Sequence, residues 1–152
     1  MTAPPAANHG DAEYQAALTL AEAAGDPARI VALLHAASAA GSGDAAYALA
    51  SSYLHDTYLA EDAEQALAFL RLATERGHPA AMYDLGSAYA EGAIAPGDDS
   101  AAFDLFFQAA LLGDRDALEE VVRCLYHGTG IRRNMRLYEL AADMLDLRDR
   151  DG

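Results

Sequence analysis

The sequence lacks several residues on which whole classes of chemistry depend. It has no lysine, and all ten of its basic residues are arginine. This absence excludes a phosphate-loop lysine, a Schiff-base lysine and a serine–lysine nucleophile pair. Tryptophan is also absent. An exclusively arginine basic set is typical of a GC-rich genome, which favours a bacterial source.

Cysteine and long apolar runs are scarce as well. The single cysteine, Cys124, cannot form an internal disulfide. Residues 1–10 have neither the basic start nor the apolar run of a signal peptide. No stretch approaches 18 uninterrupted apolar residues. We therefore expect a cytoplasmic protein with no membrane partner.

Positively charged residues are also scarce, and their scarcity limits the kinds of partner that the protein can bind. The chain has 24 acidic residues and a net charge of −14. A nucleic-acid binder needs a basic face, so we expect no nucleic-acid partner. Complementary charge permits a partner protein with a basic surface. The alternative is that the acidity serves solubility alone.

What is present predicts a folded domain. The 152 residues are 53% hydrophobic, which suits one compact domain with a core. We predict a flexible N-terminal tail at 1–10, a single repeat domain at 11–147 and a flexible C-terminal end at 148–152.

A period of 36 residues runs through the chain. Gly41, Gly77 and Gly113 are each 36 residues apart, and other positions repeat in the same register without gaps. These columns are Ala45/Ala81/Ala117, Leu49/Leu85/Val121, Tyr53/Tyr89/Leu125 and Asp62/Asp98/Asn134. Agreement of independent columns on one period indicates a repeat architecture.

Each repeat is expected to hold two helices, because its apolar residues recur at spacings of three and four. Asp26-Pro27 and Asp98 are helix-start signals, and Gly92 suits a left-handed helix end. Asp62 with Gln65 has the pattern of a capping box. The predicted helices are 11–24, 27–40, 44–56, 62–76, 79–91, 98–112, 115–127 and 134–147.

The columns also predict how the helices pack. The small positions Ala45/Ala81/Ala117 and Ala50/Gly86 suit close helix crossings, and the large positions Leu49/Leu85/Val121 and Phe69/Leu105 suit the space between pairs. A lone helix pair cannot hide its apolar face, whereas stacked pairs share one core. We therefore predict an all-α fold, a right-handed α-solenoid of about four helix-turn-helix repeats.

The best-formed repeat resembles a known family. Residues 81–92 have the form A-x-x-x-L-G-x-x-Y-x-x-G, followed by Asp98, Ala102 and a closing Ala-Ala-x-x-Gly at 109–113. This resembles the Sel1-like repeat family of the tetratricopeptide-like superfamily, over residues 28–147. The second repeat departs from the pattern at Ala50 and Asp56, and the fourth loses the central glycine and tyrosine. The resemblance implies a scaffold or adaptor role, since such repeats bind many unrelated proteins.

The resemblance also implies that the first helix of each pair lines a concave groove. Tyrosine and arginine are frequent interface anchors, so a partner-binding role is favoured. The alternative is that Tyr47 and Tyr83 only pack between helices. The groove positions predicted by helical phase are Asp44, Tyr47, Ser51, His55, Tyr83, Ser87, Glu91, Asp116, Glu119, Arg123, Tyr126 and His127.

One basic cluster stands out in this acidic chain. Arg132, Arg133 and Arg136 lie close together in the sequence. Arginine forks suit carboxylates, so the cluster is a candidate site for an acidic segment. The favoured alternative is pairing with nearby acids: Glu139, Asp143 and Glu119.

No set of residues indicates catalysis, a cofactor or a metal. His55 and His127 share a repeat phase, but they are two repeats and hence roughly 20 Å apart, too far to share a zinc ion. Cys124 aligns with Ser52 and Ala88, which favours a packed small side chain over a nucleophile.

Three functions are therefore weighed. The leading hypothesis is a protein–protein interaction module, a scaffold or adaptor that binds a protein or peptide in its groove. The alternative is an immunity protein or chaperone that neutralises a secreted bacterial toxin, for which the acidity suits a cationic target. An enzyme is the least favoured. The apolar final helix also suggests a homodimer formed through the C-terminal repeat.

Overall fold

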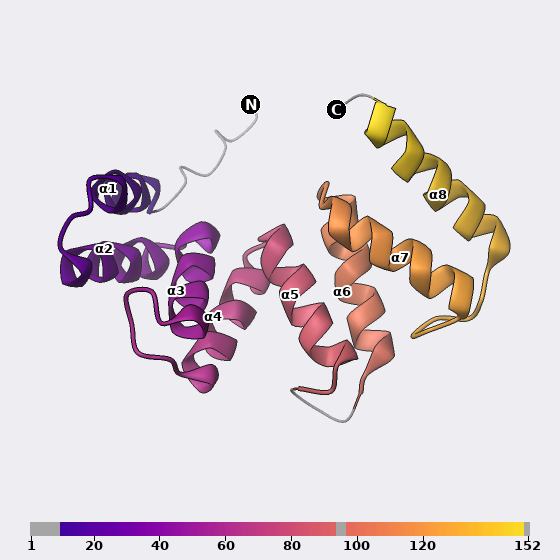
Figure 1. Ribbon diagram of the computed structural model, residues 1–152, viewed down its shortest axis with the longest axis horizontal. Coiled ribbons are helices and arrows are strands. Elements are labelled where there is room, and N and C mark those ends of the chain that lie inside the picture. Colours follow the sequence, from indigo (N-terminus) through magenta and orange to yellow (C-terminus); the bar gives the residue numbers. More distant parts are fainter. Residues whose placement is uncertain (1–9, 94–96, 151–152) are drawn as a thin grey trace, which may run out of the picture. The chain divides into compact units, whose positions relative to one another are not determined.

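The computed structural model describes residues 10–93 and 97–150, with side chains described as far as Asp146. Within these residues the chain forms eight α-helices and no strand (Figure 1). They are α1 (Asp11–Glu22), α2 (Pro27–Ala39), α3 (Gly43–His55), α4 (Ala63–Glu75), α5 (Pro79–Ala90), α6 (Asp99–Leu111), α7 (Arg115–His127) and α8 (Met135–Arg150). The all-α prediction is confirmed.

The predicted boundaries are correct within three residues. The largest difference is at α8, which continues to Arg150 instead of ending at 147. Residues 1–9 of the predicted tail and 151–152 of the predicted end lie outside the described residues, whereas residues 148–150 of that end belong to α8. In the described helices none is long and apolar enough to span a bilayer.

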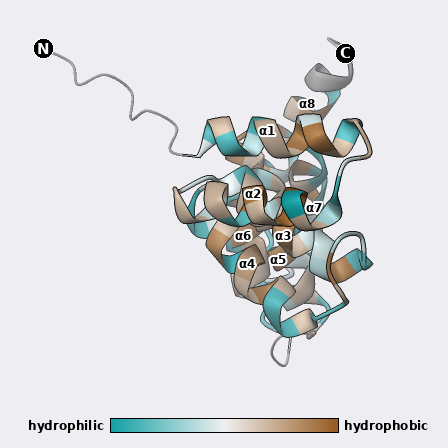
Figure 2. Cartoon of the chain, turned by 90° about the vertical axis from the view of Figure 1, so that its left-hand side faces the viewer, coloured by the Kyte–Doolittle hydropathy of each residue, from teal (hydrophilic) through white to brown (hydrophobic). Residues whose placement is uncertain are grey.

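The helices divide into two compact units. The first, Met1–His78, holds α1 to α4, and the second, Pro79–Gly152, holds α5 to α8. In the first unit, α1 alternates hydrophilic and hydrophobic segments, the pattern of a helix with one face on a core (Figure 2). That the units form one domain over 11–147 stays a prediction.

The glycines that repeat every 36 residues lie at the ends of the second helices. Gly41, Gly77 and Gly113 have φ values of 112°, 80° and 99°, a left-handed conformation that glycine adopts without a side-chain penalty. The N–H of the residue after each glycine donates a 3.0 Å bond to the carbonyl of Ala37, Ala73 or Ala109. These bonds satisfy carbonyls that a helix end leaves without partners.

Helix starts repeat with the same period. Asp26, Asp62, Asp98 and Asn134 each accept a bond from a backbone N–H two or three residues ahead, at 2.9 to 3.2 Å. These contacts satisfy N–H groups at the helix start and confirm the predicted N-caps. The capping box at Asp62 is wrong in its second half, because the Asp62 N–H donates to the carbonyl of Tyr53 at 3.1 Å.

The small columns lie where they were predicted, at close crossings. Ala45, Ala81 and Ala117 are fully buried. A Cβ added to Gly86 would lie 2.9 Å from the ring of Phe106, closer than side chains tolerate. The ring therefore occupies the space that the absent side chain leaves.

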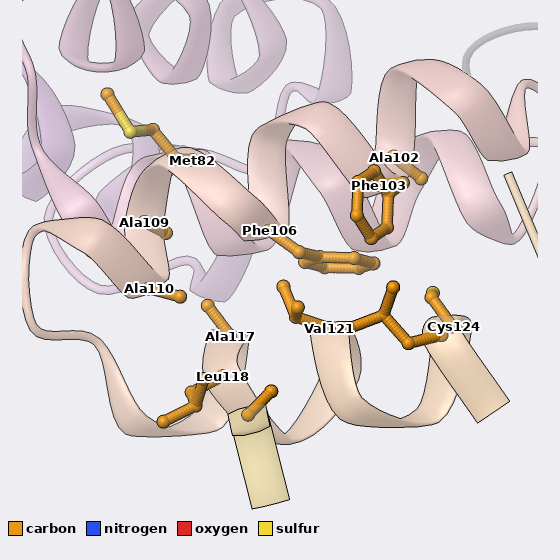
Figure 3. Packing of buried hydrophobic residues seen from close by; sticks show 12 residues of the cluster. Met82, Ala102, Phe103, Phe106, Ala109, Ala110, Ala117, Leu118, Val121 and Cys124 are labelled. Carbon is orange, nitrogen blue, oxygen red and sulfur yellow. The ribbon is translucent and has the colours of Figure 1, made fainter. Parts of the chain in front are cut away.

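The large residues form a core in each unit. In the second unit, Phe106 points from α6 toward Val121 and Cys124 of α7 (Figure 3). In the first, Ile30, Leu34 and Leu49 are buried together. Both cores thus use the aliphatic and aromatic columns of the repeat.

Candidate protein-binding faces

In the first unit, the predicted binding residues follow one face of α3. The helix starts at Ser42, whose hydroxyl accepts a 3.1 Å bond from the N–H of Ala45. Asp44, Tyr47, Ser51 and His55 follow at spacings of three and four, which places them on one side. Asp44 and His55 are exposed, and Tyr47 and Ser51 are half-buried.

A histidine outside the predicted set organises this face. The ring of His78 stacks on Tyr47 with centroids 4.4 Å apart, and its Nε2 lies 3.4 Å from Oδ1 of Asp44. The Asp44 side chain is still 61% exposed. The ring of Tyr47 is therefore in contact with His78, while the neighbouring carboxylate of Asp44 stays open to solvent.

Leu54 is a second residue that the prediction missed. It lies 72 residues before Tyr126, which is two repeats, and is 43% exposed. The 36-residue period relates Leu54 to Tyr126, but the predicted binding positions include only polar and aromatic residues. Leu54 adds an apolar contact point beside His55.

In the second unit, Tyr83 of α5 and the acidic side of α7 lie near each other. The ring of Tyr83 is half-buried, 5.7 Å from that of Phe106. Burial raises the pKa of the Tyr83 phenol, and the carboxylates of Glu120 and Asp116 raise it further. The Ser87 hydroxyl donates a 3.1 Å bond to the Tyr83 carbonyl of its own helix. Glu91 is exposed just beyond α5.

The charged residues of α7 are paired along the helix. Nη1 of Arg115 lies 2.5 Å from a carboxylate oxygen of Glu119. Nε of Arg123 donates a 2.9 Å bond to Oε2 of Glu120. Glu120 was not predicted, although its spacing of three from Arg123 is typical of a helical ion pair.

An aromatic cluster lies at the C-terminal end of α7. Tyr126 is 44% exposed, and its ring lies 5.3 Å from that of Tyr138 and 5.0 Å from that of His127. The guanidinium of Arg133 lies over the Tyr126 ring at 5.4 Å, a cation–π contact. Tyr126 is therefore held in place while much of its ring stays in solvent.

The basic cluster is exposed. Arg132, Arg133 and Arg136 all face solvent, and in the part of the chain described none of them forms an ion pair with Glu139, Asp143 or Glu119. Glu119 pairs with Arg115 instead. The favoured alternative therefore fails, and the cluster remains a candidate site.

The arrangement offers no activated nucleophile at Cys124. The side chain is 3% exposed, and burial raises the pKa of the thiol. Among the described residues, no group of three or more His, Cys, Asp or Glu side chains could hold a metal ion. Tyrosine and arginine side chains are frequent anchors in protein interfaces, and surface charges steer association between proteins.

Paired helices in a 36-residue period, with polar side chains along the first helix of each pair, define a helix-turn-helix repeat protein. The Sel1 repeat matches at residues 43–78, 79–114 and 123–144. This chain therefore belongs to the Sel1 repeat family. Such repeats generally mediate protein–protein interaction, and the proteins that contain them are typically non-enzymatic scaffolds.

Similar solved structures include two helical repeat proteins. The Sel1 repeat protein from Oxalobacter formigenes has a TM-score of 0.73 and 26% identity, covering 76% of this chain and 86% of that one. The c5321 protective antigen of uropathogenic Escherichia coli, with an SLR fold, has a TM-score of 0.81 and 17% identity. That match covers 91% of this chain but 30% of the antigen. Both agree with a helical solenoid. No curated protein matched the sequence significantly.

Proposed function

We propose that this protein is a scaffold or adaptor that binds a partner protein or peptide along the first helices of its repeats. The observation that carries this is the presence of accessible side chains on first helices within each unit: Asp44 of α3 is exposed in the first unit, and Asp116 and Tyr126 of α7 are exposed in the second. None of these three is needed to fill a core, so they are available to a partner.

The exposed carboxylates give the partner a chemical character. Asp44 of α3 and Asp116 of α7 carry exposed negative charge, as does Glu91 just beyond α5, in a chain of net charge −14. A partner with a basic surface would associate faster with such a face and would be favoured over an acidic competitor. Tyr126, beside Arg133, would supply an aromatic anchor.

Co-purification followed by mass spectrometry tests this proposal. The tagged full chain is expected to retain a partner that a Tyr47→Ala, Tyr83→Ala, Tyr126→Ala variant loses. Because Tyr47 and Tyr83 also contact His78 and Phe106, circular dichroism must show that the variant is folded. Tyr126→Ala alone removes an exposed ring and serves as the second variant.

Leu112→Ala is the control for Tyr126→Ala, because Leu112 is a 55% exposed apolar side chain at the end of α6, a second helix. The control should retain the partner. A partner that survives the tyrosine variants unchanged would contradict the proposal.

The acidity also supports a second candidate, an immunity protein or chaperone for a cationic secreted toxin. In this case the partner would be encoded next to the chain's own gene, and adding this protein would stop the toxin's activity. A neighbouring toxin or secretion gene would support this role, whereas a captured partner encoded elsewhere would favour the general scaffold.

A further inference from the structure

An apolar groove lies in the second unit, apart from the predicted binding face. It has a volume of about 400 Å³ and is lined by α6, α7 and α8. Val121 of α7 is among the residues that line it, and of the described lining residues only Asp104 is charged. The large side chains around it are exposed: Phe107 45%, Leu111 71%, Leu137 46%, Leu140 60% and Met144 46%.

The repeat itself does not require this apolar surface. One repeat earlier, the same five positions hold Arg71, Glu75, Ala101, Asp104 and Gln108. Four of these five are polar or charged, and those four are exposed. Since the fold accepts polar residues there, the large apolar side chains at the groove are not explained by the stability of a repeat. Exposed apolar surface of this kind marks a contact site.

The exposed face of α8 has the pattern of a helix–helix seam. Leu137, Leu140 and Met144 are spaced by three and then four residues, so they form one stripe along the helix. Arg136 and Asp143 are seven residues apart and exposed, so they lie on the same flank of that stripe near its two ends.

This charge arrangement specifies a second copy of the helix. When two copies of α8 run antiparallel, equivalent flanks face each other, so Arg136 of each copy would face Asp143 of the other. Symmetry makes two such ion pairs. In a parallel pair, Arg136 would instead face Ala141.

We infer that this groove is a homodimer interface in which α8 of a second copy lies antiparallel to α8. The apolar stripe of each copy covers Phe107 and Leu111 of the other, and the two Arg136–Asp143 pairs fix the direction. The inference does not depend on the partner-binding proposal, because it concerns other side chains and needs no foreign protein.

Sedimentation equilibrium of the full chain tests the dimer. The wild-type protein should show a concentration-dependent mass that rises to twice that of the monomer. Leu140→Asp should weaken association at least about 100-fold, because it would bury a charge in the interface. The position is 60% exposed in one copy, so the variant should fold; Leu140→Gln provides a milder second variant. Leu18→Asp, at a 39% exposed leucine of α1, is the control and should leave the dimer intact.

Charge reversal tests the antiparallel direction. Arg136→Asp and Asp143→Arg should each weaken the dimer about tenfold, since each places like charges opposite one another. The double variant should recover close to wild-type association. The two residues are too far apart along one helix to pair within it, so recovery requires a second copy.

Three results would overturn the inference. A wild-type chain that stays monomeric at high concentration would exclude the dimer. Association that survives Leu140→Asp would exclude this face, and failure of the double variant to recover would exclude the antiparallel direction. A monomer that loses a foreign protein upon Leu140→Asp would assign the groove to that protein instead.

Discussion

Gly86 lies where α5 meets Phe106 of α6, and its missing side chain leaves room for the ring. The equivalent pair one repeat earlier is Ala50 and Leu70, and one repeat later it is Val122 and Ala142. As the first residue of the pair grows, the second shrinks. Such exchanges keep the volume at a crossing nearly constant.

Gly86→Ala should therefore couple to Phe106→Leu. Alone, Gly86→Ala crowds the ring, although the better helix propensity of alanine offsets part of that cost. In the Phe106→Leu background the crowding is relieved, so the double variant should be more stable than the single effects predict, by about 1 kcal/mol. Urea denaturation of the four proteins gives this coupling. Strictly additive effects would contradict the steric account.

Cys124 should be unreactive in the folded protein. Its burial raises the pKa of the thiol, which disfavours the reactive thiolate. A thiol reagent at pH 7.5 should modify native Cys124 at least about 100-fold more slowly than the urea-unfolded chain, since reaction requires local opening. Fast native modification would show that the crossing of α6 and α7 is open.

Residue-scale prediction succeeded for burial and was weaker for contacts. The alanine columns and Leu49, Leu85 and Val121 are buried as their period indicated. The pairing of His78 with Tyr47, by contrast, joins a turn to the middle of α3 and depends on how α4 packs. No periodicity in the sequence carries that information.

At the scale of the helix, the start signals were the most reliable. An aspartate or asparagine before an apolar-periodic segment stops the preceding turn and satisfies the first N–H groups, so it identifies a helix start locally. The second bond of the capping box, from the Asp62 N–H to the Gln65 side chain, is not formed. The Asp62 N–H instead donates to the carbonyl of Tyr53 in the preceding helix. Tertiary structure thus decided the second half of the motif.

The Asp62 cap should make a measurable contribution to stability. Its carboxylate accepts bonds from the N–H groups of Glu64 and Gln65, each at 3.1 Å. Asp62→Ala should lower the free energy of unfolding by about 1 kcal/mol, whereas Asp62→Asn keeps an acceptor and should lose much less. Chemical denaturation distinguishes the two variants; equal losses would exclude capping as the cause.

At the scale of the whole molecule, the period and the family pattern were enough to predict the fold class. The apolar groove of the second unit was predicted only in part, from the leucines and methionine of α8. The contribution of Phe107 and Leu111 was missed because their position is polar in the earlier repeat, at Arg71 and Glu75. A repeat identifies what is shared, whereas a binding surface depends on what differs between repeats.

Ionic strength should control the capture of a basic partner. Exposed charges are screened beyond about 10 Å at 0.1 M salt. If the carboxylates of the first helices attract the partner, its association rate should fall steeply between 50 mM and 500 mM salt, while dissociation changes less. Surface plasmon resonance with the co-purified partner measures both rates. A salt-independent association rate would contradict an electrostatic role.

The central claim is that the first helices bind the partner. It is tested most directly by measuring the affinity of the partner for two charge-matched double variants. Asp44→Lys with Asp116→Lys changes exposed carboxylates on α3 and α7, and Glu64→Lys with Glu75→Lys changes exposed carboxylates on α4. The first variant should bind at least about tenfold more weakly than the wild type, and the second should bind nearly as the wild type does. Equal loss in both variants, or loss only in the second, would contradict binding along the first helices.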